Sequence, residues 1–141
     1  MAKKKFLGLQ YPLRKTARGV LAQRYGVDQI KADLLQLLLT NPGERVMMPT
    51  YGTPLRELMF EPNDIGLEAR ARKMISDSIE LWEPRIVVTD ILVASNFDPN
   101  DLDPLDSKDD LEHILGIKIR FVDPQNITEV DELVLELPIG D

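Results

Sequence analysis

The chain has 141 residues, of which 43% are hydrophobic and 29% are charged, a composition typical of one soluble globular domain. It contains no cysteine, which excludes disulfides and thiol chemistry, and it has no apolar run long enough to span a membrane. The net charge of −7 is unevenly distributed, because the first 24 residues carry seven basic side chains and no acidic one. Residues 97–141 carry 13 acidic and three basic side chains, so the sequence combines a basic start with an acidic body.

Residues 1–26 have no helical periodicity and predict an extended basic arm in front of a single domain over residues 27–141. Such an arm buries too little apolar surface to order itself, so we expect it to be mobile in a monomeric free protein. Its charge suits it to binding a partner, although simple solvation explains the charge equally well. Nucleic acid is a poor candidate partner, because the acidic body would repel phosphate. The candidate partner-binding residues of the arm are Lys3, Lys4, Lys5, Arg14, Lys15 and Arg18.

Two helices are predicted in the first half of the domain. The first begins near Asp28, which acts as its N-cap, and Asn41-Pro42-Gly43 stops it. The second is short, with Thr53 as its cap and Pro54 at its first helical position, and it ends at Glu61-Pro62. The apolar face of the first helix consists of Ile30, Leu34, Leu35, Leu37 and Leu38.

A longer third helix is predicted from Asn63 or Asp64 to about Trp82. Because the residue before a proline disfavours helical backbone, Glu83-Pro84 ends this helix. Residues at three- and four-residue spacing predict one buried stripe, formed by Leu67, Ala71, Met74, Ile75, Ser78 and Trp82.

The second half of the chain predicts strands. Residues 86–93 are rich in β-branched side chains, and residues 115–121 and 133–137 alternate between leucine, isoleucine or phenylalanine and other residues. Residues 96–110 are acidic, contain two prolines and predict a long polar loop. Three helices followed by about three strands predict an α+β fold, with the helices packed on one face of a small, mainly antiparallel sheet.

The tripeptide Glu83-Pro84-Arg85 lies where the last helix meets the first strand. Pro84 fixes its own φ and restricts Glu83 to extended backbone, so Glu83 and Arg85 are expected to project to the same side. They then either pair with each other or present a carboxylate and a guanidinium to a neighbouring subunit. A surface salt bridge at a helix stop is the simplest alternative. We expect Arg85 to order an interface, so that an Arg85→Ala monomer stays folded, whereas an internal buried pair would make this variant unstable.

The connector over residues 43–55 combines glycines and prolines, which predicts a rigid loop with Tyr51 available for packing. Trp82 and the pair Met47-Met48 are candidates for a partner surface. Their apolar character favours a place in the core instead.

The sequence offers no catalytic residues, cofactor site or metal site. His113 is the single histidine and there is no cysteine, so no nucleophile–base set is available. The aspartates of residues 98–106 lack the central glycine and the final glutamate of a calcium loop. Carboxylates for glycoside hydrolysis are plentiful, but Arg85 beside Glu83 favours a charged carboxylate over a general acid.

Several motifs together resemble one family, the inner-wedge baseplate proteins of contractile-tailed phages, which have counterparts in type VI secretion and tailocin baseplates. Each motif alone is weak evidence, whereas the ordered set, which covers about residues 28–138, is specific. Residues 119–123 and 133–137 are similar to the closing strands of the family. The other motifs that carry the resemblance are Ile30-Lys31-x-x-Leu34-Leu35, Gly43-x-Arg45, Pro49-x-Tyr51-Gly52, Phe60-Glu61 and Trp82-Glu83-Pro84-Arg85-Ile86.

The resemblance implies a non-enzymatic structural protein of the virion tail baseplate, assembled in the host cytoplasm, without membrane or nucleic-acid partners. It implies a domain like the handshake domain of sheath proteins, present in about six copies around the tube. Its partners would be the sheath protein and other wedge subunits, with tube-initiating or hub proteins as further candidates. The motif Glu83 to Arg85 would lie at contacts within the wedge core. The alternatives are a peptidoglycan-degrading baseplate lysozyme, a name that members of this family carry, and a free-standing assembly or binding module.

The predicted sheet also suggests how such a protein would bind a sheath subunit. A sheet of about three strands leaves edges whose N–H and C=O groups lack partners. An extended strand of a sheath subunit could pair with such an edge, backbone to backbone. The candidate residues are Val134 and Glu136 in the last strand, where alternating leucines keep one face buried and fix the register.

Overall fold

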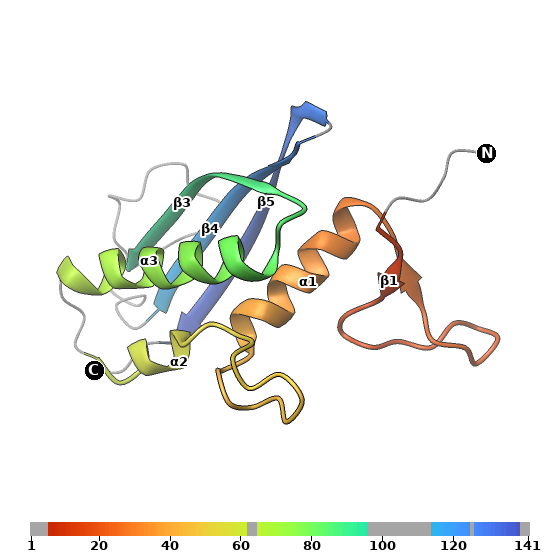
Figure 1. The fold of residues 1–141 in the computed structure, drawn as a ribbon, viewed down its shortest axis with the longest axis horizontal. Coiled ribbons are helices and arrows are strands. Elements are labelled where there is room, and N and C mark those ends of the chain that lie inside the picture. The colour runs from red at the N-terminus through yellow and green to blue at the C-terminus, as the bar shows by residue number, and fades with distance from the viewer. Residues whose placement is uncertain (1–5, 62–64, 96–113, 125, 139–141) are drawn as a thin grey trace.

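In the computed structural model of the chain, the described residues are 6–61, 65–95, 114–124 and 126–138. Three helices precede a three-stranded sheet, and a short two-stranded ribbon precedes the helices (Figure 1). The α+β fold class predicted from the sequence is therefore confirmed. The acidic loop, Lys3, Lys4, Lys5, His113 and the predicted cap Asn63 or Asp64 lie outside the described residues.

The helices are α1 (Val27–Leu39), α2 (Leu55–Leu58) and α3 (Ile65–Trp82). Both caps predicted for the first two helices are wrong. Gly26 is the N-cap of α1, and Asp28 lies in the first turn instead. Pro54 is the N-cap of α2, and no side chain caps this helix. The Thr53 hydroxyl donates to the backbone oxygen of Leu37, 3.2 Å away, and so fastens the connector to α1.

The sheet consists of β3 (Val87–Ser95), β4 (Ile114–Asp123) and β5 (Asn126–Pro138), antiparallel in the order β3-β4-β5. Ile91, Ile119 and Leu133 are aligned across the three strands, and all three are buried. Figure 1 shows α3 lying across the sheet with α1 beside it, so these side chains face the helices. The helix stripes complete the core through Ile30, Leu34, Leu37, Leu38, Leu67, Ala71 and Ile75.

The described part of the arm has more regular structure than the sequence predicted. Strand β1 (Gly8–Leu9) pairs antiparallel with β2 (Gln23–Arg24), and the Gln10 amide donates to the Ala22 oxygen at 3.0 Å. The chain between them folds back on itself through a bridge between Lys15 and Leu21. This ribbon lies beside α1 (Figure 1). Its apolar side chains are largely exposed, namely Leu7, Leu9, Leu13, Val20 and Leu21.

Within the described residues, no helix has the length and apolar character needed to cross a membrane.

Candidate functional site: the Glu83–Arg85 centre and the edge strand β5

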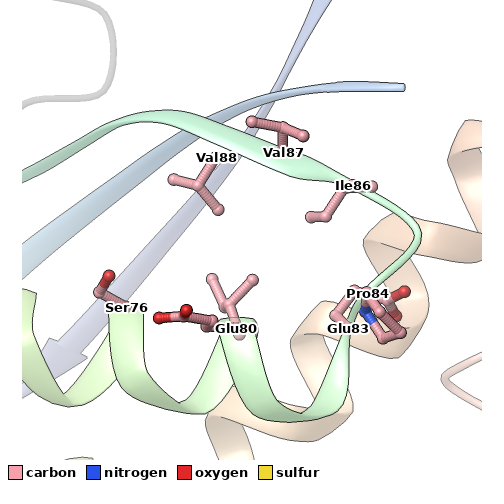
Figure 2. Close-up of a pocket in the computed structure, with 8 residues that line it drawn as sticks. Ser76, Glu80, Glu83, Pro84, Ile86, Val87 and Val88 are labelled. Atoms are coloured by element: carbon pink, nitrogen blue, oxygen red, sulfur yellow. The ribbon is translucent and has the colours of Figure 1, made fainter. Parts of the chain in front are cut away.

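The tripeptide Glu83-Pro84-Arg85 sits between the end of α3 and the start of β3. Figure 2 shows Glu83 and Pro84 at this turn. The backbone amide of Glu83 still donates to the oxygen of Ile79 at 2.8 Å, so the last helical turn holds Glu83 in place. Pro84 then stops the helix, as the sequence predicted. Glu83 is only 5% exposed, and it is the single charged residue among the buried residues of the described part of the chain.

Arg85 neutralises this buried carboxylate. Its Nε donates to Glu83 Oε1 and its Nη2 to Glu83 Oε2, each at 2.5 Å, in the two-pronged geometry that suits a guanidinium and a carboxylate. Nη2 also donates to Asp33 Oδ2 of α1 at 2.6 Å. The hydrogen bonds to Glu83, and secondarily those to Asp33, raise the pKa of Arg85, while partial burial opposes the shift. Arg85 therefore joins α1 to the junction of α3 and β3.

This geometry corrects the interpretation of Arg85 as an interface residue alone. Glu83 and Arg85 project to the same side, as predicted, but they pair with each other inside the subunit. The Arg85 side chain is 32% exposed, so part of it still faces solvent. Arg85 is therefore a structural residue whose outer side is also available to a partner.

An aromatic cluster joins the connector to the same centre. The rings of Tyr51 and Trp82 meet edge to face with centroids 5.3 Å apart, and the Arg45 guanidinium lies 4.0 Å from the centroid of Tyr51. Burial raises the pKa of Tyr51. The Arg45 guanidinium lowers this pKa, and the Asp33 and Glu83 carboxylates raise it. Arg45 also donates to Gln36 Oε1 of α1 at 3.2 Å. The predicted rigid connector is thus fastened to α1 and to the end of α3.

Gly52 shows why the connector requires a glycine. Its φ is +124°, and a Cβ atom at this position would lie 2.3 Å from the backbone oxygen of Thr40. The Gly52 oxygen accepts a hydrogen bond from the buried Ser78 hydroxyl of α3 at 3.2 Å. The connector therefore crosses between α1 and α3 at van der Waals distance, which no larger residue permits.

The start of the arm also contacts this centre. The Phe6 ring lies 5.4 Å from the Arg85 guanidinium carbon. Gly8 lies directly against Gln29, whose Nε2 donates to Asp33 Oδ1 at 2.8 Å. Gln29 is buried, and its Oε1 has no hydrogen-bond partner among the described residues. The arm therefore covers a polar group without satisfying it, which makes its docking weak.

Gly8→Ala is expected to release the start of the arm from the centre. The added Cβ would lie 2.5 Å from the Gln29 side chain, which is held by Asp33 and cannot move away freely. Nuclear magnetic resonance should then show loss of the contacts between the Phe6 ring and Arg85. A Gly8→Ala/Gln29→Ala double variant has room for the methyl group and should recover these contacts. Unchanged contacts in Gly8→Ala would mean that Gly8 does not govern docking.

The candidate residues of the arm that the structure describes are not brought to the centre. Arg14, Lys15 and Arg18 are exposed on the ribbon of the arm. Sequence reasoning missed Asp33 and Gln29, the partners of Arg85 and of the arm. The available signal was their spacing, since two polar side chains four residues apart on one helix can face the same neighbour.

Val134 and Glu136 lie on β5, which is an edge strand of the described sheet. The Thr89 hydroxyl of β3 donates to the Arg120 oxygen at 3.1 Å, so the backbone groups of Arg120 point toward β3. Along a strand the backbone N–H and C=O groups of successive residues point to opposite neighbours. The backbone groups of residues 117, 119 and 121 of β4 therefore point toward β5, where these residues pair with residues 135, 133 and 131. The backbone N–H and C=O of Val134 and Glu136 therefore point out of the sheet. Pro138 lies an even number of residues after Val134 and Glu136, so its nitrogen also points out of the sheet. A proline, which has no N–H, is tolerated at such an outward position, and this agrees with the assignment.

A shallow cavity of about 370 Å³ lies between the end of α3 and the start of β3 (Figure 2). Both carboxylate oxygens of Glu83, on its wall, are hydrogen-bonded to Arg85. Within the described residues, no group of three or more histidine, cysteine or acidic side chains could hold a metal ion. The cavity is lined by Ser76, Ile79, Glu80, Glu83, Pro84, Ile86, Val87 and Val88.

Solved structures with a similar fold include one chain named as a tail lysozyme and two baseplate chains. A Geobacter sulfurreducens chain that carries the name tail lysozyme aligns with a TM-score of 0.65 at 21% identity, over 81% of this chain and 91% of that one. A chain of the anti-feeding prophage baseplate aligns with a TM-score of 0.60 at 20% identity, over 96% of this chain and 86% of that one. A chain of the pyocin R2 baseplate after contraction aligns with a TM-score of 0.53 at 21% identity, over 96% of this chain and all of that one. At these identities the likeness shows the fold alone.

Sequence comparison identifies the family. Baseplate protein W of Escherichia phage P2 is 28% identical over 72 residues, which cover 51% of this chain and 63% of that protein. The match thus spans less than two thirds of the relative. The family model described as baseplate wedge protein gp25 matches residues 24–121, which include α1, the connector, the Glu83–Arg85 centre, β3 and most of β4, but not β5. The chain therefore belongs to the baseplate wedge protein gp25 family, structural proteins of contractile tail baseplates.

Proposed function

We propose that the protein is a non-catalytic subunit that links the wedge scaffold to the first sheath ring and starts sheath assembly. In this proposal about six copies surround the tube, each held by other wedge subunits through the exposed side of the Glu83–Arg85 centre. The observation that carries the proposal is that β5 is an edge strand of the sheet in the described residues, and its outward-facing backbone groups at Val134 and Glu136 can pair with a strand from a sheath subunit. Leu133, buried among the described residues, keeps the register of that edge fixed.

A lysozyme function has no support in the geometry of the centre. A glycosidase general acid must hold a proton, usually in an apolar pocket. Glu83 is instead paired with Arg85 through both of its oxygens. Purified protein is therefore expected to leave a suspension of cell walls turbid, and clearing of the suspension would revive the lysozyme alternative.

The proposal is tested with baseplates assembled without this protein. Sheath should fail to polymerise on such baseplates and should grow to full length when the purified protein is added back, as seen by electron microscopy. Mass spectrometry of intact tails should find the protein in the particle. Its absence from tails that are complete would favour the alternative of a free-standing assembly module.

A further inference from the structure

The start of the arm is docked on the Glu83–Arg85 centre at a cost to its own backbone. Phe6, whose ring lies 5.4 Å from the Arg85 guanidinium carbon, has a φ of +55°. It is the one residue other than glycine with a positive φ in the part of the chain that the structure describes. Left-handed backbone is strained for a residue with a bulky side chain. The contacts of the docked arm therefore hold Phe6 in a conformation that it would otherwise leave.

The docked arm also blocks a hydrogen-bonding group of α1. The backbone of Gly8 lies against the side-chain amide of Gln29, and a Cβ atom on Gly8 would stand 2.5 Å from Gln29 Nε2. Gln29 is 4% exposed, and its Oε1 has no hydrogen-bond partner among the described residues. A buried acceptor without a donor destabilises the docked state. This acceptor can gain a donor only when the arm leaves.

Asp33 holds the same acceptor beside Arg85. Gln29 Nε2 donates to Asp33 Oδ1 at 2.8 Å, and Arg85 Nη2 donates to Asp33 Oδ2 at 2.6 Å. The other terminal nitrogen of Arg85, Nη1, makes no hydrogen bond among the described residues. One carboxylate thus holds an unused acceptor and an unused donor on the face that Phe6 and Gly8 cover.

The chemistry of this face fits a neutral segment of backbone. A peptide unit offers an N–H for Gln29 Oε1 and a C=O for Arg85 Nη1. An anionic ligand fits less well, because the single guanidinium already faces two carboxylates, those of Glu83 and Asp33. The centre therefore has no positive charge left for a phosphate or a carboxylate.

The arm is built to move as one body. The ribbon is held by its own hydrogen bonds, among them those from the Gln10 amide to the Ala22 oxygen and from the Ala22 amide to the Arg14 oxygen. Gly26 joins this ribbon to α1, beside which it lies (Figure 1). Its φ is +66°, and no atom lies within 4 Å of the position that a Cβ would take. A glycine in open space lets the chain pivot, so the ribbon can swing away while α1 stays folded.

We propose that residues 6–8 form an autoinhibitory strap, which a backbone segment of another wedge subunit displaces from the Glu83–Arg85 centre. This inference rests on the proposed function and describes how its wedge contact is regulated. The incoming segment donates an N–H to Gln29 Oε1 and accepts a hydrogen bond from Arg85 Nη1. Relief of the strain at Phe6 and pairing of Gln29 offset the loss of the docked strap. The free subunit thus keeps its wedge contact covered until the scaffold is present.

The experiment measures binding of full-length variants to wedge scaffold purified from baseplates that lack this subunit. Phe6→Ala removes the ring from Arg85, and Gly8→Ala forces the strap off Gln29. Each variant should bind on the order of 10-fold more tightly than the unaltered protein, the gain for a strap that is docked in about nine molecules of ten. The matched control is Val20→Ala, at a side chain of the ribbon that is 63% exposed, and it should bind like the unaltered protein.

A double variant tests the chemistry of the incoming segment. Phe6→Ala/Gln29→Met keeps the strap released and preserves the volume of the side chain at position 29, but it removes the acceptor. It should bind about 10-fold more weakly than Phe6→Ala, as expected when a buried donor of the partner loses its acceptor. Equal binding by these two variants would overturn the backbone contact to Gln29.

Nuclear magnetic resonance contacts between residues 8 and 29 report whether the strap is docked in each protein. If Phe6→Ala and Gly8→Ala lose these contacts but bind the scaffold no more tightly, the strap does not inhibit, and the proposed function stands. If neither variant loses them, Phe6 and Gly8 do not hold the strap, and the inference fails. If neither the unaltered protein nor the released variants bind the scaffold, the proposed wedge contact is wrong as well.

Discussion

Arg85→Ala is expected to lower the free energy of unfolding by about 3 kcal/mol, the low end of the range for breaking a buried ion pair. The variant leaves the Glu83 carboxylate almost fully buried without its counter-ion, and it also removes the hydrogen bond to Asp33 Oδ2. The value is at the low end because a third of the Arg85 side chain already reaches solvent. Urea unfolding followed by the fluorescence of Trp82, the only tryptophan, measures the change.

Two controls separate this effect from the loss of any ion pair. Lys73→Ala removes a pair with Asp77 that is exposed on both sides, and it should change the free energy of unfolding by less than about 0.5 kcal/mol. Arg85→Lys keeps the charge but cannot make two parallel bonds to Glu83, so its loss should fall between those of Lys73→Ala and Arg85→Ala. If Arg85→Ala is as stable as the unaltered protein, the centre acts at an interface only.

The helices and strands could be predicted because their burial follows a local period. The stripe of α3 repeats at three- and four-residue spacing, and Leu67, Ala71, Ile75 and Ser78 are buried as expected. Alternation in β4 likewise predicted that Ile117, Ile119 and Phe121 face the core. These patterns exist because one face of each element must leave water, whatever the details of its partners.

The centre depends on contacts that no local pattern contains. Asp33 meets Arg85 across 52 residues, and only the packing of α1 against the end of α3 brings them together. The Thr53 cap failed for a similar reason, because its hydroxyl bonds across to α1 rather than to its own helix. Local propensity competes with tertiary hydrogen bonds, and here the tertiary bonds decide.

Met47 is 91% exposed, like Val46 beside it at 92%, although its apolar character favoured the core. Hydrophobicity argues for burial only in one direction. Core residues are usually apolar, but many apolar residues stay on the surface. Their environment follows from the backbone bonds that close the connector, above all the one from Gly43 to Pro49. Such a turn cannot be predicted from composition alone.

Val134→Pro is expected to abolish sheath polymerisation while the protein itself stays folded. The Val134 amide points away from β4, so proline removes no hydrogen bond of the described sheet. Pro138 already occupies a position of the same parity in β5. The lost amide is one that an added sheath strand would use, and the proline ring would also obstruct the approach of that strand. Glu136→Pro should behave in the same way for the same reason.

Two substitutions in the same strand serve as controls for this prediction. Leu135→Pro removes an amide that faces β4 and with it a hydrogen bond of the sheet, so its failure would be one of folding. Val134→Ala keeps the outward amide and should support full-length sheaths. Electron microscopy of sheaths grown on baseplates carrying each variant measures the outcome, and urea unfolding confirms which variants are folded. If sheaths reach full length on baseplates that carry folded Val134→Pro protein, then strand pairing at this edge does not start the sheath, and the link must be made through another surface of the subunit.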